Sequence, residues 1–163
     1  MNIIAAADKN WGIGYKGDLL CHIKEDMKFF KEMTVNKAVI MGKNTFLSLP
    51  GQKPLKDRKN YVLTTDKNFK AEGAEICPSL ETAVELAKSE FKDEDIFIIG
   101  GESVYNKAVD ICSTAYITKI DAEFCADKHI TNFDKLEKWH IAGEKKVETE
   151  KGININFVKY EKK

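Results

Sequence analysis

The stretch Ile96–Ser103, which reads IFIIGGES, decides the fold of this chain. Its first four residues are all apolar, so they predict a strand that is buried on both faces. Gly100 and Gly101 follow that strand, and a helix is expected from about Ser103 to Val109. A strand that runs through glycines into a helix is typical of an α/β sheet, in which ligands bind beyond the carboxyl ends of the strands.

The same alternation of apolar runs and amphipathic stretches extends outward in both directions. It predicts further strands at Asn2–Ala7, Ala38–Met41, Tyr61–Leu63 and Ala115–Ile120. Helices are expected at Ile23–Met33, from Gly42, and after Ser79, whose side chain is expected to cap the helix that follows. Pro50–Asp57, with two prolines and a glycine, indicates an exposed loop.

The last third of the sequence has a different pattern. Trp139–Val147 and Ile153–Tyr160 are long, partly alternating segments with Gly152 in the turn between them, so they predict two antiparallel strands. The expected fold is therefore α/β: one domain over residues 1–163, with a mainly parallel central sheet, an antiparallel C-terminal edge strand and flanking helices.

Composition narrows the possible functions. Of the 163 residues 43% are hydrophobic and 32% are charged, which is the balance of an ordinary soluble globular protein. Lys plus Arg equals Asp plus Glu, at 26 each, so no nucleic acid and no anionic membrane is expected as a partner. No exposed apolar stripe is evident, and the chain is expected to be a monomer.

The cysteines and histidines are scattered along the chain. Cys21, Cys77, Cys112 and Cys125 form no CxxC pair, and the three histidines have no metal-ligand spacing. We therefore expect reduced thiols, no metal site and a cytoplasmic location. Neither a transmembrane segment nor a signal peptide is predicted.

Asp26 is the most informative single residue. On a wheel of 3.6 residues per turn, Ile23, Met27, Phe30 and Met33 fall on one side of the predicted helix, with the charged residues opposite. Asp26 lies with the apolar group, where burial penalises its charged form. It is either a structural acid paired within the core or an acid that projects into a ligand pocket, where a carboxylate can accept two parallel N–H bonds.

Two glycine blocks lie at strand ends. Ile99–Ser103 and Met41–Thr45 each join a strand to a helix, and both let a ligand approach the backbone near free N–H groups. Each alone could be a tight turn, but two in one small domain suggest a dinucleotide or bisphosphate ligand. Lys43, Thr64 and Thr65 could hold an additional phosphate, or they could be ordinary surface residues.

Arg58 is the only arginine in the chain, and it follows the Pro/Gly loop. A guanidinium there suits bidentate binding of a carboxylate, with a surface ion pair as the alternative.

Taken together, these residues resemble the dihydrofolate reductase family over nearly the whole chain. The matching blocks are Ile3–Ala6, Trp11–Gly14, Glu25–Lys31, Val39–Thr45, Ile98–Tyr105 and Tyr116–Asp121. The resemblance implies an oxidoreductase that reduces 7,8-dihydrofolate to 5,6,7,8-tetrahydrofolate by hydride transfer from NADPH.

The resemblance also implies a substrate site. Asp26, assisted by Thr118, would bind the pterin and be the catalytic residue that anchors and polarises the ring, and Arg58 would bind the glutamate α-carboxylate. The remaining substrate residues would be Ile4, Ala5, Met27, Phe30, Leu49, Leu55 and Ile99.

A cofactor site is implied by the same resemblance, with Lys43 and Thr64 at the 2′-phosphate. The residues toward the nicotinamide and pyrophosphate would be Ala6, Ile13, Gly14, Leu19, Ile99, Gly100, Gly101, Glu102, Ser103, Val104 and Tyr105. Those toward the adenosine half would be Gly42, Lys43, Asn44, Thr45, Leu63, Thr64 and Thr65. Asp127 would lie in a second loop that steadies the mobile loop containing Ile13 and Leu19.

The mobile loop departs from the family pattern. Leu20 and Cys21 stand where members often have Pro-Trp, which puts the water network near the pterin in doubt. Two alternative functions remain: a related pyrimidine reductase of riboflavin synthesis, which should lack the acid at Asp26, and a non-catalytic folate- or nucleotide-binding module.

Overall fold

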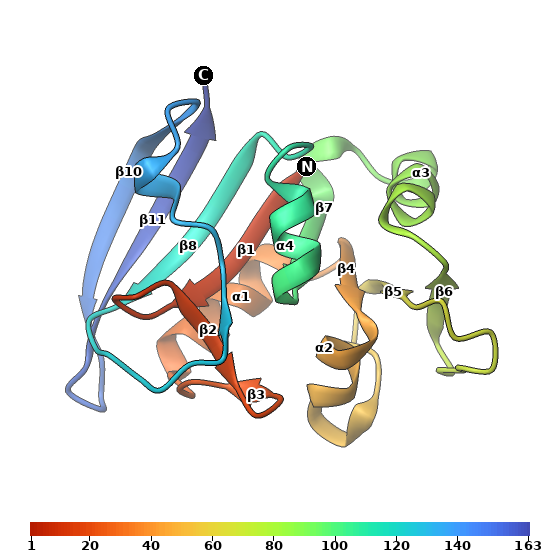
Figure 1. Ribbon diagram of the computed structural model, residues 1–163, viewed down its shortest axis with the longest axis horizontal. Helices are drawn as coiled ribbons and strands as arrows, with labels where there is room; N and C mark the ends of the chain where they lie inside the picture. Colours follow the sequence, from red (N-terminus) through yellow and green to blue (C-terminus); the bar gives the residue numbers. More distant parts are fainter.

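The computed structural model describes residues 1–163 and contains a central eight-stranded sheet (Figure 1). The strand order is β10-β11-β8-β1-β7-β4-β5-β6. These strands are β1 (Asn2–Ala7), β4 (Ala38–Gly42), β5 (Lys59–Leu63), β6 (Ala74–Cys77), β7 (Ile96–Gly100), β8 (Thr114–Ile120), β10 (Trp139–Glu148) and β11 (Asn154–Lys162).

The sheet is mainly parallel, as the sequence predicts. Neighbouring strands from β8 through β6 all pair in parallel, whereas β11 pairs antiparallel with both β8 and β10. The carboxyl ends of the parallel strands therefore meet at one edge, which Figure 1 shows at its lower side.

Helices cover both faces of this sheet. They are α1 (Lys24–Thr34), α2 (Lys43–Ser48), α3 (Leu80–Glu90) and α4 (Glu102–Ala108), with short 3₁₀ turns at Pro50–Gln52, Asp93–Asp95 and Phe133–Lys135. In Figure 1, α4 lies in front of the sheet and α1 behind it. Ser79 caps α3 as expected, because its hydroxyl accepts the Thr82 N–H.

The core follows from the alternation of strand side chains. Ile3 and Ile98 belong to a cluster of 23 buried residues that includes side chains of α3 and α4. Their chain neighbours Ile4 and Ile99 belong to a second cluster, against which Phe30 of α1 packs. Alternate residues along each strand thus point to opposite faces of the sheet. The residues at the strand ends lie at the carboxyl edge of the sheet.

The wheel of α1 is wrong for one residue. Met27 is 54% exposed, whereas Phe29 packs toward the sheet with its ring centroid 4.6 Å from that of Phe157 and 6.5 Å from that of Tyr116. The wheel assumed one broad apolar face, but α1 covers the sheet with only one flank and leaves Met27 outside it.

A second sheet of three short strands was not predicted. It has the order β3-β2-β9, formed by β2 (Gly12–Tyr15), β3 (Asp18–Leu19) and β9 (Lys128–His129). It joins the segment after β1 to the segment after β8, which are more than a hundred residues apart in the chain.

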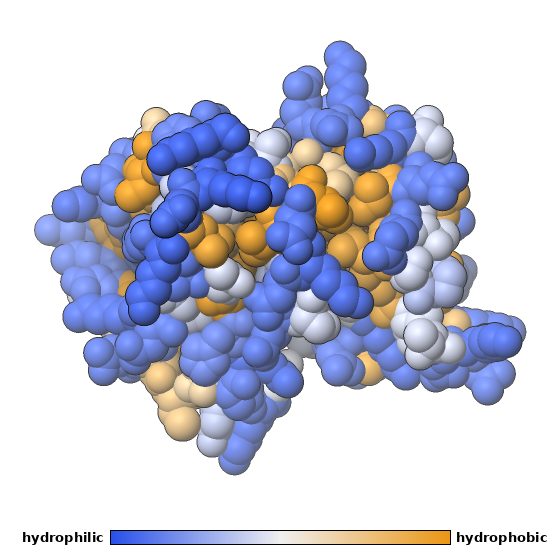
Figure 2. Space-filling model, turned by 45° about the horizontal axis from the view of Figure 1, so that its top comes forward, coloured by the Kyte–Doolittle hydropathy of each residue, from blue (hydrophilic) through white to orange (hydrophobic).

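No helix in the structure has the length and apolar character needed to cross a membrane. Figure 2 shows hydrophobic residues near the middle of one face of the molecule, surrounded by hydrophilic ones.

Candidate active site

Asp26 lies in the first turn of α1, half-buried and against the end of β8. The hydroxyl of Thr118, a buried residue of β8, hydrogen-bonds to its carboxylate. Burial raises the pKa of Asp26 above the ordinary value, and the hydrogen bond from Thr118 partly opposes that rise. The acid is therefore paired with a single hydroxyl and has no cationic partner, as a ligand-binding carboxylate would be.

Tyr105 lies close enough to Asp26 to be affected by its charge, and it also hydrogen-bonds to the central strand β1. Its hydroxyl donates a 2.8 Å hydrogen bond to the carbonyl of Ile4, and both residues are buried. Burial raises the pKa of Tyr105 well above its usual range, and the negative charge of Asp26 adds to that rise. Tyr105 is consequently a neutral donor at physiological pH, which fixes the position of the Ile4 carbonyl.

Apolar side chains surround the cleft between α1 and the segment after α2. Phe30, Leu49 and Leu55 are partly buried and pack against the same cluster, which contains Ile4 and Ile99. Three of the predicted wall residues are thus brought together, whereas Met27 stands exposed at the edge.

Arg58 is held in place at one end of this wall. Its Nη1 donates to the hydroxyl of Thr34 at 3.1 Å, and its Nε donates to the carbonyl of Lys56 at 2.9 Å. The guanidinium carbon lies 6.0 Å from the centre of the Phe30 ring. Nη2 has no partner within the chain, so the guanidinium is oriented while part of its donor capacity stays free.

Asn60 stabilises the loop that carries Arg58, a role that was not predicted from the sequence. Its buried side chain accepts from the N–H of Leu55 at 2.9 Å and donates to the carbonyls of Leu55 and Arg58, each at 3.0 Å. The only available signal was a polar residue beside the apolar run of β5.

The two glycine blocks meet at the carboxyl edge of the sheet. β4 and β7 are parallel neighbours, with Met41 in register with Gly100. A Cβ added at Gly100 or Gly101 would lie 3.1 or 3.2 Å from the hydroxyl of Thr45. The blocks form one backbone surface next to the N-termini of α2 and α4, as the sequence predicts, and Gly100 within it is buried.

Lys43 and Thr64 lie beside this surface, but neither is free. Lys43 Nζ forms a 3.2 Å ion pair with Asp66 and lies 5.0 Å from the centre of the Phe69 ring. The Thr64 hydroxyl accepts the N–H of Asp66 at 3.0 Å. The hydrogen bonds from the Asn68 N–H and from Lys43 keep the pKa of Asp66 below its usual range. Asp66, which was not predicted from the sequence, thus pairs with the lysine that was expected to bind a phosphate.

The predicted mobile loop forms the small second sheet. Gly14 of β2 pairs with Leu19 of β3, and Leu19 is 56% exposed. Asp127 donates its N–H to the Gly14 carbonyl and accepts the Lys16 N–H, each at 3.0 Å. The expected contact of Asp127 with the first loop is confirmed.

Cys21 is partly buried and packs against a third cluster, formed by Ile23, Ile120 and Ile155. Ala6 and Phe124 pack against the same cluster. The cysteine therefore acts as a small apolar residue between the loop and the start of α1.

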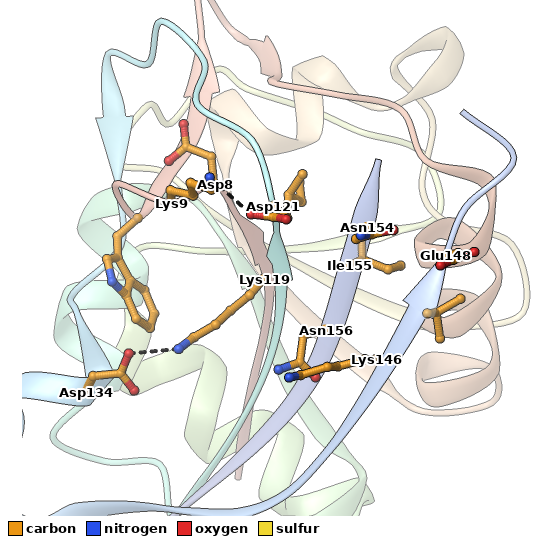
Figure 3. A pocket seen from close by; sticks show the side chains of 13 residues that line it. Asp8, Lys9, Lys119, Asp121, Asp134, Lys146, Glu148, Asn154, Ile155 and Asn156 are labelled. Atoms are coloured by element: carbon orange, nitrogen blue, oxygen red, sulfur yellow. Dashed lines mark hydrogen bonds and ion pairs between the residues drawn. The ribbon is translucent and has the colours of Figure 1, made fainter. Parts of the chain in front are cut away.

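A cavity of about 770 Å³ lies elsewhere (Figure 3). Lys119 lines it, and because side chains alternate along β8, Lys119 lies on the face opposite Thr118 and Asp26. The cavity is lined mainly by polar groups, many already paired, such as Lys119 with Asp134 at 2.8 Å. The predicted substrate residues instead lie together on the other face, where Phe30, Leu49 and Leu55 pack against the cluster of Ile4 and Ile99.

Comparison with known proteins agrees with this geometry. Residues 1–162 match the family model described as dihydrofolate reductase. Dihydrofolate reductase from Bacillus subtilis is 32% identical over 100% of this chain and 95% of its own length, and the enzyme from Neisseria gonorrhoeae is 36% identical over 98% and 96%. A solved structure of Enterococcus faecalis dihydrofolate reductase, complexed with NADP(H) and RAB-propyl, superposes with a TM-score of 0.88 at 27% identity, covering 99% of this chain and 95% of that one.

These comparisons assign the chain to a class of NADPH-dependent oxidoreductases. The chain belongs to the dihydrofolate reductase family. Its activity is the reaction that defines this family, the NADPH-dependent reduction of dihydrofolate.

Proposed function

We propose that the cleft beside Asp26 binds dihydrofolate and that this carboxylate is its anchor. Asp26, with Thr118, accepts the N3–H and 2-amino donors of the pterin, since a carboxylate can take two parallel N–H bonds. Phe30, Leu49 and Leu55 enclose the pterin and aminobenzoate, with Met27 covered when the ligand is present. Arg58 uses its free Nη2 edge for the glutamate α-carboxylate.

The neighbouring glycine surface suits a dinucleotide. Gly42, Gly100 and Gly101 leave space that a Cβ would fill, next to the first turns of α2 and α4. These residues would hold the pyrophosphate, with Ile99 and Tyr105 toward the nicotinamide and Lys43 with Thr64 toward the 2′-phosphate. Bound NADPH supplies a hydride to C6 of the pterin.

The protein contributes alignment and electrostatics. The Ile4 carbonyl, fixed by Tyr105, lies at the junction of the two half-sites and orients the groups that meet there. Asp26 polarises the pterin ring and favours its protonated form, while Ile13 and Leu19 close over the nicotinamide from the small sheet. The observation that carries this proposal is Asp26 itself, half-buried in an apolar cleft with a hydroxyl as its partner.

The direct test is absorbance-monitored oxidation of NADPH in the presence of dihydrofolate, with NADH run in parallel. We expect turnover with NADPH and much weaker turnover with NADH. Binding of both ligands without turnover, in a folded sample, would instead support a binding module. A folded sample that reduces a pyrimidine intermediate of riboflavin synthesis but not dihydrofolate would support that rival reductase.

We further propose one domain over residues 1–163, a monomeric state and a cytoplasmic location. The single main sheet draws strands from both ends of the chain, which supports one cooperative unit. The four cysteines are free, as suits a reducing compartment. A single unfolding transition, a sedimentation mass of one chain and fractionation with cytosolic markers are the expected results.

A further inference from the structure

Asp8, at the end of β1, is a buried charged residue that the site described so far does not use. Its side chain is almost inaccessible, with 3% of the residue exposed. A buried carboxylate is costly unless it is fully hydrogen-bonded, so its partners show what it does.

Those partners are three backbone N–H groups in two separate segments. Oδ1 accepts from Asn10 at 2.9 Å and from Gly12 at 2.8 Å, and Oδ2 accepts from Phe124 at 3.0 Å. The first two donors belong to the segment that becomes β2, and the third belongs to the segment after β8. One side chain therefore joins two loops that are more than a hundred residues apart.

Gly12 is required for this arrangement. A Cβ at Gly12 would lie 2.5 Å from the Cβ of Ala126, and 3.1 and 3.2 Å from the two carboxylate oxygens of Asp8. The backbone of β2 thus approaches the second loop and the carboxylate more closely than any other residue type allows.

Both segments that Asp8 joins continue toward residues of the proposed active site. Beyond Gly12 lie Ile13 and Gly14, which belong to the strand proposed to close over the nicotinamide. On the other side, the Phe124 side chain packs against the cluster of Ile23, Ile120 and Ile155, as Ala6 and Cys21 also do. A displaced Asp8 would shift both neighbours of the nicotinamide pocket together.

Figure 3 shows Asp8 in the wall of the large cavity, with the exposed pair of Lys9 and Asp121 close by. That pair spans the same two segments at 3.2 Å, but its side chains are more than half exposed, so it contributes little. It provides a natural control for the buried contact.

We propose that Asp8 is a positioning residue, which holds the closing loop over the nicotinamide by binding the N–H groups of Asn10, Gly12 and Phe124. The inference rests on the proposed function of the cleft. Asp8→Asn keeps the size of the side chain but turns one acceptor into a donor, which must face either Phe124 or the Asn10–Gly12 turn.

The test compares wild type, Asp8→Asn and Asp121→Asn, using NADPH deuterated at the transferred position. In Asp8→Asn we expect the hydride-transfer rate per folded molecule to fall roughly 10- to 100-fold, because small misplacements of reacting groups have effects of that size. Its deuterium isotope effect on turnover should rise toward the intrinsic value, whereas Asp121→Asn should match wild type.

A purely structural role would lower the folded fraction and leave the isotope effect unchanged, and that result would overturn the proposal. An inactive wild type would instead count against the proposed function. If Asp8→Asn does not fold, amide hydrogen exchange of the wild type decides: the amides of Asn10, Gly12 and Phe124 should exchange at one shared, slow rate. Rapid exchange at Phe124 alone would contradict the link between the loops.

Discussion

The two halves of the proposed site differ in the groups that they offer to a ligand. On the substrate side, charged side chains stand at either end of an apolar wall: Asp26 on α1 and Arg58 after the loop. On the cofactor side, the surface consists of backbone at Gly42, Gly100 and Gly101, and its cation is already paired with Asp66. Function on the substrate side should therefore depend on single residues, whereas on the cofactor side it is distributed over many contacts.

The largest effect should come from Asp26→Asn. The amide is nearly isosteric but cannot accept two N–H bonds or carry charge, so turnover at pH 7 should fall about 100- to 1000-fold, in the range typical of lost acid–base groups. The loss should shrink at low pH, where substrate arrives already protonated. Steady-state assays across pH check this, and full activity at pH 7 would remove Asp26 from its role.

Arg58→Leu should have the next largest effect. Loss of a charge-assisted bond to the glutamate carboxylate, worth about 1.5–3 kcal/mol, corresponds to roughly a 10- to 100-fold rise in KM for dihydrofolate. The kcat should change little, because this contact is equally present in ground and transition states. Lys56→Leu, an exposed neighbour, is the matched control. A decrease confined to kcat would contradict the assignment.

On the cofactor side, Gly101→Ala tests whether backbone forms the surface. The new Cβ would lie 3.2 Å from the Thr45 hydroxyl, so it would crowd the backbone at the strand end where pyrophosphate is expected. We predict about a tenfold rise in the Kd for NADPH, equivalent to roughly one lost hydrogen bond. Gly143→Ala, where a Cβ meets nothing within 4 Å, should bind NADPH like wild type. Equal binding by both variants would refute the proposed cradle.

Substitutions in the Lys43–Asp66 pair should have a smaller effect on the KM for NADPH, and the two partners should change it in opposite directions. Lys43→Ala should raise the KM for NADPH about three- to tenfold and leave that for NADH unchanged, since one partly exposed charge is removed. Asp66→Asn should lower the KM for NADPH, because it frees the lysine for the 2′-phosphate. Parallel KM measurements with both cofactors check both variants, and a common change for NADPH and NADH would contradict a phosphate contact.

The smallest effect concerns stability. Because burial raises the pKa of Asp26, ionised Asp26 disfavours folding at pH values above that raised pKa, and the protonated form carries no such penalty. Asp26→Asn should therefore melt a few degrees higher than wild type at pH 7, and the difference should shrink as the pH falls through the raised pKa and be absent below the ordinary aspartate pKa. Calorimetry at pH 7 and pH 3 tests this; a lower melting temperature at pH 7 would show that Asp26 stabilises the fold.

The sequence predicted those features that repeat at short range. The segments that form β1, β4, β7 and β8 are rich in apolar residues, which predicted buried strands. The period of the α-helix alone predicted that Asp26 lies on the apolar side of its helix. The meeting of Gly100 with the Met41 block follows from parallel strands, whose carboxyl ends share an edge.

Features set by long-range contacts could not be predicted in this way. β2, β3 and β9 have two to four residues each and form only because distant loops pair. Phe29 rather than Met27 faces the sheet because the angle at which α1 packs decides which side of the helix is buried. A helical wheel contains no information about that angle. Asn60 and Asp66 act through loop conformations that leave no periodic signal.

The most direct test of the division between the two halves is ligand binding by Asp26→Asn, measured separately for NADPH and for folate by titration of intrinsic fluorescence. The structure predicts a Kd for NADPH within about twofold of wild type and a Kd for folate weakened by more than about tenfold, as expected for loss of a charged anchor. Equal weakening of both ligands would show that Asp26 supports the whole cleft and would contradict its role as the substrate's anchor.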